Sequence, residues 1–90
     1  MPIAVYIHPE AMSAAQYDEI MQKLEAAGQG QPKGRSHHSV FGPDDHLMVY
    51  DVWDSQESFD AFGQTLMPIL GELGVDPGQP DVMPVRNIVQ

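Results

Sequence analysis

The sequence of 90 residues contains no cysteine, one tryptophan and only four lysine and arginine residues. Without cysteine, neither a disulfide nor a thiolate metal site can support the fold. Such a composition is typical of proteins in a reducing cytosol, so a cytoplasmic location is expected. No stretch approaches the roughly 20 apolar residues of a membrane span, and the N-terminus lacks the basic and apolar regions of a signal peptide.

Basic residues are scarce beside 13 acidic ones, which gives a formal net charge of −9. Such a surface repels phosphate backbones and anionic lipids, so we expect no nucleic acid and no membrane as partners. A simpler interpretation is that the net negative charge keeps the protein soluble. A chain this short is expected to form one domain, residues 1–90, and to bury only about 60% of its unfolded surface. Oligomerisation is a common way to bury more.

The pattern of apolar residues predicts four strands and two helices. Strands are expected at 3–8, 35–41, 46–53 and 81–89, the last at a sheet edge because it contains Pro84. One helix is expected after Ser13, which forms a capping-box pattern with Gln16, and to end at Gly28. A second is expected after Ser55, with a kink at Pro68.

This element order, β-α-β-β-α-β, predicts an α+β fold of the ferredoxin-like type with a four-stranded antiparallel sheet. Right-handed crossovers place the strands in the order 4-1-3-2, with both helices on one face. The other face then exposes roughly 400 Å², much of it apolar. A second copy would cover it, so we expect a homodimer.

Residues 51–62 (DVWDSQESFDAF) resemble the acidic-x-Trp-x-Ser-x-Glu-x-Phe pattern of the dimeric α/β-barrel superfamily. The resemblance is greatest to the small antibiotic-biosynthesis-monooxygenase-like proteins. It implies a dimeric α/β barrel with a ligand pocket between the sheet and helices of each subunit. It also implies a choice among cofactor-independent monooxygenases acting on aromatic polyketides or quinols, haem-degrading oxygenases, lactone isomerases and proteins of other roles.

The haem-degrading proteins of this superfamily carry a histidine late in the second helix and an asparagine in the first strand. Counting along the second helix puts Glu72 near the ligand position, and the only asparagine is Asn87. We therefore expect no haem. Many monooxygenase-like members also have a histidine where this chain has Phe62, which leaves a non-catalytic role open.

The predicted hairpin, with Phe41 opposite His46, groups the polar residues by face. His38, Asp51 and Trp53 share one face, and we expect Asp51, diagonal to His38, to orient it as a general base beside an aromatic wall. The alternative is a structural role, in which a half-buried histidine is simply hydrogen-bonded to an aspartate. Ser36 is expected on this face and Arg35 on the other.

The opposite face holds His37 across from Tyr50. Adjacent strand residues point to opposite sides, so His37 and His38 cannot bind one metal ion, and no metal site is expected. His37, Tyr50 and Arg86 are candidate substrate-binding residues together with Trp53. His37 and Tyr50 are equally explained as a cross-strand pair in the dimer interface, and Arg86 as the ion-pair partner of an acidic residue.

Together with the family resemblance, these residues predict a cofactor-independent monooxygenase or isomerase acting on a small aromatic or polyketide-like molecule, with no bound cofactor. His38 and Asp51 would be catalytic, and Trp53 and Tyr50 would be walls of the pocket. The alternative is a non-catalytic small-ligand-binding or assembly module of the same fold.

Overall fold

A computed structural model describes all residues from 1 to 90. It contains six elements in the order β1 (Ile3–Ile7), α1 (Ala14–Ala26), β2 (Arg35–Phe41), β3 (Met48–Trp53), α2 (Gln56–Glu72) and β4 (Asp81–Pro84). The predicted order β-α-β-β-α-β is confirmed.

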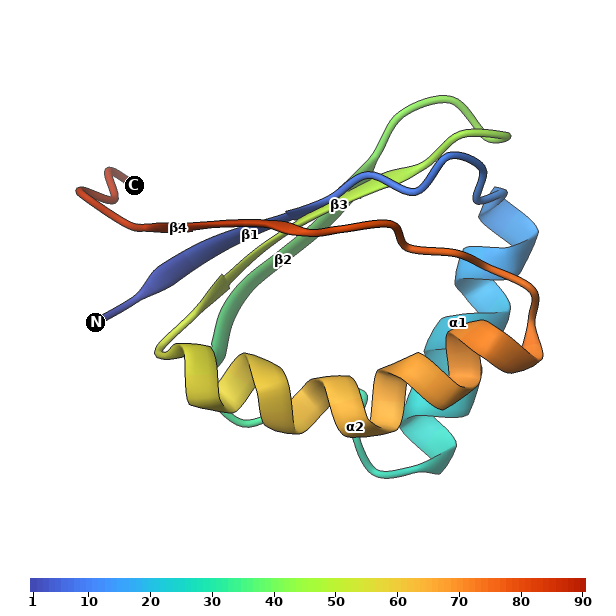
Figure 1. The fold of residues 1–90 in the computed structure, drawn as a ribbon, viewed down its shortest axis with the longest axis horizontal. Coiled ribbons are helices and arrows are strands. Elements are labelled where there is room, and N and C mark those ends of the chain that lie inside the picture. The colour runs from blue at the N-terminus through green and yellow to red at the C-terminus, as the bar shows by residue number, and fades with distance from the viewer.

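The four strands form one antiparallel sheet in the order β2-β3-β1-β4. Both helices lie on one face of this sheet, and nothing covers the other face (Figure 1). The predicted ferredoxin-like α+β architecture is therefore confirmed. Between the sheet and the helices lies a core in which Trp53 and Val5 are fully buried. Neither helix is long and apolar enough to cross a membrane.

Capping residues fix where each helix begins. Ser13 accepts a hydrogen bond from the Gln16 backbone N–H at 3.1 Å, and the Gln16 side chain accepts one from the Ser13 backbone at 2.9 Å. Ser55 caps α2 through the backbone N–H of Ser58. Because a capped start sets the phase of a helix, these contacts decide which side chains face the sheet. Helix α2 continues through Pro68 to Glu72.

The β2–β3 hairpin differs from the predicted register by two residues. Phe41 pairs with Met48 rather than with His46, so the connecting loop is longer than the predicted four-residue turn. The loop is held against the start of α1, where the Leu47 N–H donates to the Met12 carbonyl and the Ala14 N–H to the Asp44 carbonyl. Because side chains alternate with a period of two, a shift of two residues leaves every side chain on its predicted face.

A register irregularity at the start of β2 does move side chains between faces. Arg35 pairs with Trp53 and His37 with Val52, so Ser36 is the extra residue of a bulge. The prediction that Ser36 shares the face of His38 is wrong: Ser36 is exposed and donates to the Val52 carbonyl. Arg35 lies on the face of His38 instead.

Gly34 precedes this bulge and adopts φ 94°, a conformation that side chains other than glycine rarely adopt. A Cβ here would lie 2.7 Å from atoms of Asp54 and Ser58, at the start of α2. The Gly34 carbonyl also accepts from the Asp54 N–H at 2.7 Å. The absence of a side chain thus lets the β2 entrance approach the start of α2, which sets where Arg35 emerges.

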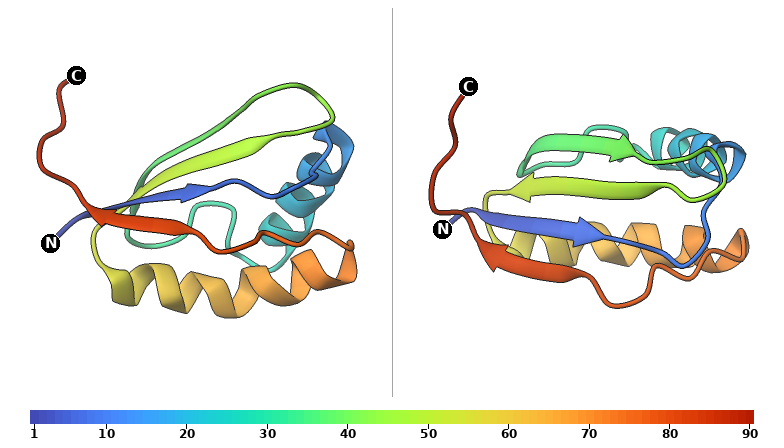
Figure 2. Two further views of the ribbon diagram at one scale, coloured as in Figure 1. Left: turned by 45° about the horizontal axis from the view of Figure 1, so that its top comes forward. Right: turned by 90° about the horizontal axis from the view of Figure 1, so that it is seen from above.

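Strand β4 is shorter than predicted, because it ends at Pro84 rather than at Val89. Val85 donates its N–H to the Pro2 carbonyl, and no further ladder follows. The remaining residues bend away from the sheet as a tail without regular secondary structure (Figure 2). Ile88 and Val89 are therefore 54% and 86% exposed.

Candidate active site

A cavity of about 60 Å³ lies between the sheet and the two helices. Most of its lining is apolar and comes from both helices, β1, β3 and the segment before β4. Four polar side chains interrupt this lining: Tyr17, Arg35, His38 and Asp51. The volume holds a few water molecules, so an aromatic ligand would have to widen the cavity.

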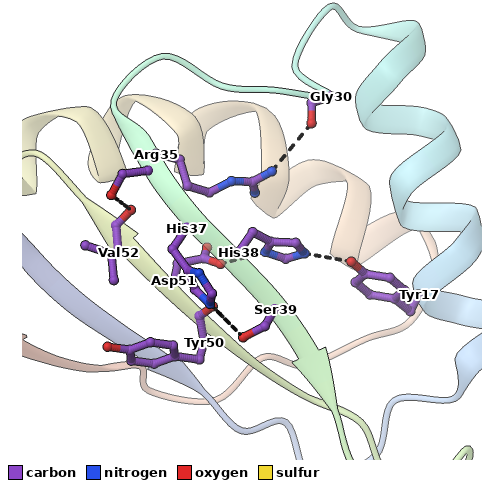
Figure 3. Close-up of polar contacts among 10 residues, drawn as sticks. Tyr17, Gly30, Arg35, His37, His38, Ser39, Tyr50, Asp51 and Val52 are labelled. Carbon is purple, nitrogen blue, oxygen red and sulfur yellow. Dashed lines mark hydrogen bonds and ion pairs between the residues drawn. The ribbon is translucent and has the colours of Figure 1, made fainter. Parts of the chain in front are cut away.

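His38 and Asp51 form the polar centre of the cavity (Figure 3). They are direct cross-strand partners on β2 and β3, and the His38 Nδ1 lies 2.6 Å from the Asp51 Oδ1. The Asp51 side chain is 3% exposed and that of His38 is 20% exposed. A carboxylate only accepts hydrogen bonds, so Asp51 holds the proton of the imidazole on Nδ1 and leaves the lone pair on Nε2.

The other nitrogen of His38 contacts a residue from α1. The Tyr17 hydroxyl lies 2.6 Å from His38 Nε2, and the two rings are nearly parallel, with centroids 6.0 Å apart. Because Nδ1 holds the proton, the tyrosine hydroxyl donates to Nε2. The result is a continuous chain of hydrogen bonds from Tyr17 through His38 to Asp51.

Burial raises the pKa of the Tyr17 hydroxyl, and the nearby carboxylates of Asp51 and Asp18 raise it further, whereas the Arg35 guanidinium opposes them. Tyr17 is therefore a neutral hydrogen-bond donor at neutral pH. The carboxylates disfavour a phenolate here, because it would add negative charge to a partly dry, acidic surrounding.

Arg35 extends over the aromatic wall of the cavity. Its guanidinium carbon lies 5.7 Å from the centroid of the Phe62 ring and 5.9 Å from that of Trp53. Its hydrogen bond to the Gly30 carbonyl is long, at 3.5 Å. Figure 3 shows Arg35 and His38 projecting from β2 toward the same side, where α1 lies.

The structure separates the other predicted site residues from this centre. Trp53 is fully buried in the core behind Phe62 and Arg35, and it is not among the residues that line the cavity. Its indole Nε1 has no hydrogen-bond partner. Phe62 and Tyr17 are the aromatic residues that line the cavity, whereas Trp53, although on the same face of β3 as Asp51, packs against Phe59 and Phe62.

His37 and Tyr50 lie on the open face of the sheet, away from the cavity. Their ring centroids are 5.7 Å apart, but they are diagonal neighbours, since Ser39 is the direct partner of Tyr50. Arg86 was expected in the middle of the last strand, which is wrong: it is exposed in the tail beyond β4. None of these three residues lines the cavity with His38 and Asp51.

Sequence reasoning missed two residues of the site, Tyr17 and Arg35. Tyr17 lies in the predicted apolar stripe of α1, where a buried hydroxyl requires a partner; this signal was present in the sequence. Arg35 could not be found in the same way, because its face depends on a bulge that the composition of β2 does not reveal.

The arrangement is suited to moving a proton. An imidazole held by a buried carboxylate in an apolar cavity is a usual form of general base, and the adjacent hydroxyl can donate to an oxygen that gains negative charge. No three histidine, aspartate or glutamate side chains converge in a way that could hold a metal ion.

The fold is that of solved antibiotic-biosynthesis-monooxygenase-like proteins, and the resemblance predicted from residues 51–62 is confirmed at the level of fold. One solved structure of this kind is SnoaB, a cofactor-independent oxygenase from Streptomyces nogalater. It matches with a TM-score of 0.70 and 15% identity, covering 98% of this chain and 96% of SnoaB.

Two further solved structures have the same fold. A candidate antibiotic biosynthesis monooxygenase from Chloroflexus aurantiacus matches with a TM-score of 0.65 and 17% identity, covering 99% of this chain and 98% of its own. Rv0793 from Mycobacterium tuberculosis matches with a TM-score of 0.61 and 11% identity, covering 100% and 98%. No protein-family model and no curated protein matches the sequence.

Proposed function

We propose that the protein is a cofactor-independent monooxygenase acting on a small aromatic or polyketide-like molecule. The observation that carries this proposal is the hydrogen-bonded chain Tyr17–His38–Asp51, which ends in an apolar cavity between sheet and helices. The shared fold with a cofactor-independent oxygenase supports it.

The reaction begins with removal of a proton. His38 Nε2 accepts the proton of an acidic hydroxyl, or of a CH₂ group activated by an adjacent aromatic ketone, and Asp51 stabilises the imidazolium that forms. The substrate anion then reduces O₂. At a CH₂ carbon, one oxygen atom forms the new C=O bond and the other leaves as water with the two hydrogens. In 1,4-naphthalenediol, one oxygen atom replaces a ring hydrogen to give 2-hydroxy-1,4-naphthoquinone, and the other leaves as water. The substrate supplies all four electrons, so the balance needs no other reductant.

Oxygen uptake tests this proposal. With anthrone or 1,4-naphthalenediol, we expect the protein to accelerate O₂ consumption well above the spontaneous rate. For anthrone, one O₂ should be consumed per ketone formed, with no hydrogen peroxide released. The control is the same assay without protein, because both compounds oxidise slowly by themselves. A substrate that binds, as measured by calorimetry, but reacts only at the spontaneous rate would contradict catalysis.

One observation favours a second function, the binding of a small molecule without catalysis. The Tyr17 hydroxyl occupies His38 Nε2, the atom that a base must offer to its substrate. A substrate must therefore displace this hydroxyl, whereas a ligand that is merely bound could leave it in place. Binding without oxygen uptake, in the assay above, is the outcome expected of such a module.

We also propose that the protein is a homodimer formed through the helix-free face of the sheet. This face carries Phe41, Tyr50 and Met83, which are 45%, 37% and 62% exposed. Tyr6 stacks on Phe41 with ring centroids 6.3 Å apart and donates its hydroxyl to the Met48 sulfur. Aromatic and methionine side chains are typical of interface cores, and a second copy would remove them from water.

Sedimentation tests the dimer. At micromolar concentration we expect a species of twice the chain mass of 9.9 kDa. Tyr50→Glu should produce a folded monomer, because it would place a buried charge beside its own symmetry mate. Met67→Glu is the matched control, since Met67 is 53% exposed on α2, away from this face. A stable wild-type monomer would contradict the proposal.

A further inference from the structure

We propose that Arg35 binds a carboxylate of the substrate, so that the cavity selects aromatic acids with a hydroxyl beside the carboxylate. The inference rests on the proposed site but not on whether that site is catalytic. It assigns to the cavity a substrate class, an anionic aromatic molecule, that the hydrogen-bonded chain alone does not specify.

Arg35 has no carboxylate partner in a chain with 13 acidic residues. The ion pairs of the protein join Lys23 to Glu72, His8 to Asp81 and His38 to Asp51. The one hydrogen bond of the guanidinium, to the Gly30 carbonyl, is at the 3.5 Å limit of such a contact. A half-buried guanidinium therefore keeps most of its five N–H donors available.

The guanidinium is also held in place before any ligand arrives. It lies within cation–π distance of the rings of both Phe62 and Trp53, which hold the guanidinium against the aromatic wall. The planar edge of an arginine matches the two oxygens of a carboxylate, and a group already fixed loses little entropy on binding. An exposed lysine at this position would have neither a planar edge of N–H donors nor a fixed position before binding.

The location of Arg35 fits this role. Arg35 and His38 line the apolar cavity, and both also line a shallow surface groove with Ser36 and His37. These two residues therefore stand where the cavity meets solvent. An aromatic acid with its ring inside would meet Arg35 with its carboxylate and His38 with its hydroxyl.

The charges around the cavity make this one cation decisive. Asp51 is the negative group of the lining, but it is 2% exposed and its Oδ1 is bonded to His38. The protein as a whole carries a formal net charge of −9 and repels anions. An incoming anion is thus stabilised by the Arg35 guanidinium and by no other cation of the lining.

Salicylate and salicylamide test the inference, because they differ only in a carboxylate against a neutral amide. Binding is followed by calorimetry and by the Arg35 Nε–H signal in NMR titrations. We expect salicylate to bind the wild type about 10- to 100-fold more tightly than salicylamide, the usual value of a charge-assisted pair. Arg35→Gln should abolish this preference, and Arg35→Lys should restore part of it.

Arg86→Gln is the matched control, because it removes the same charge from the exposed tail; the preference should survive it. Equal affinities for the two ligands, or equal losses in Arg35→Gln and Arg86→Gln, would overturn the inference and leave the proposed function standing. If neither ligand binds at millimolar concentration, the aromatic site itself is refuted and both proposals fall. Thermal melting of each variant ensures that a folded protein is compared.

Discussion

Replacing His38 with alanine is expected to lower turnover by roughly 10²- to 10⁴-fold, the usual span for the loss of a general base. His38 is the only histidine that lines the cavity, and the substrate proton has no comparable acceptor there, because the Asp51 Oδ1 is bonded to His38 Nδ1 and Tyr17 is neutral. Initial rates of O₂ uptake at saturating substrate measure the effect.

His8→Ala is the control for this variant. His8 is an exposed histidine that pairs with Asp81 at 3.0 Å, on a different part of the sheet. Its loss should leave the rate unchanged within about twofold. If His38→Ala retains most of the wild-type rate while its melting temperature is unchanged, His38 is not the base. If the protein only binds its ligand, the same substitution should weaken binding by about 1–3 kcal/mol.

The second large effect concerns Asp51→Asn, whose loss of turnover should not add to that of His38→Ala when the two are combined. Asparagine is nearly isosteric with aspartate and can still accept from Nδ1, so the ring should stay in place while the charge is lost. A charge-assisted hydrogen bond exceeds a neutral one by about 1–1.5 kcal/mol, so Asp51→Asn alone should cost roughly tenfold in turnover. The double variant should be no slower than His38→Ala, because Asp51 acts through His38.

The double-mutant cycle distinguishes a shared role from two separate ones. If the losses multiply, Asp51 acts on the substrate by itself and the hydrogen-bonded chain is not a unit. The ¹⁵N shifts of the His38 ring provide a readout that a purely structural role would not move. In the wild type they should show the proton on Nδ1, and in Asp51→Asn a mixture of the two tautomers.

The sequence determined the order of the elements, the order of the strands and the side of the sheet on which each of His38, Asp51, His37 and Tyr50 lies. Strand alternation has a period of two, so the two-residue error in the hairpin register did not change these faces. The observed register does change the pairing within this face, because Asp51 is directly opposite His38 rather than diagonal to it.

The tertiary structure decided the rest of the site, because it depends on contacts between segments far apart in the chain. The loop before β3 docks on the start of α1 and sets the register; the Ser13 cap turns Tyr17 toward His38. One extra residue in the bulge moves Arg35 into the cavity. Short-range patterns do not encode such contacts, since each depends on the packing of helices against the sheet.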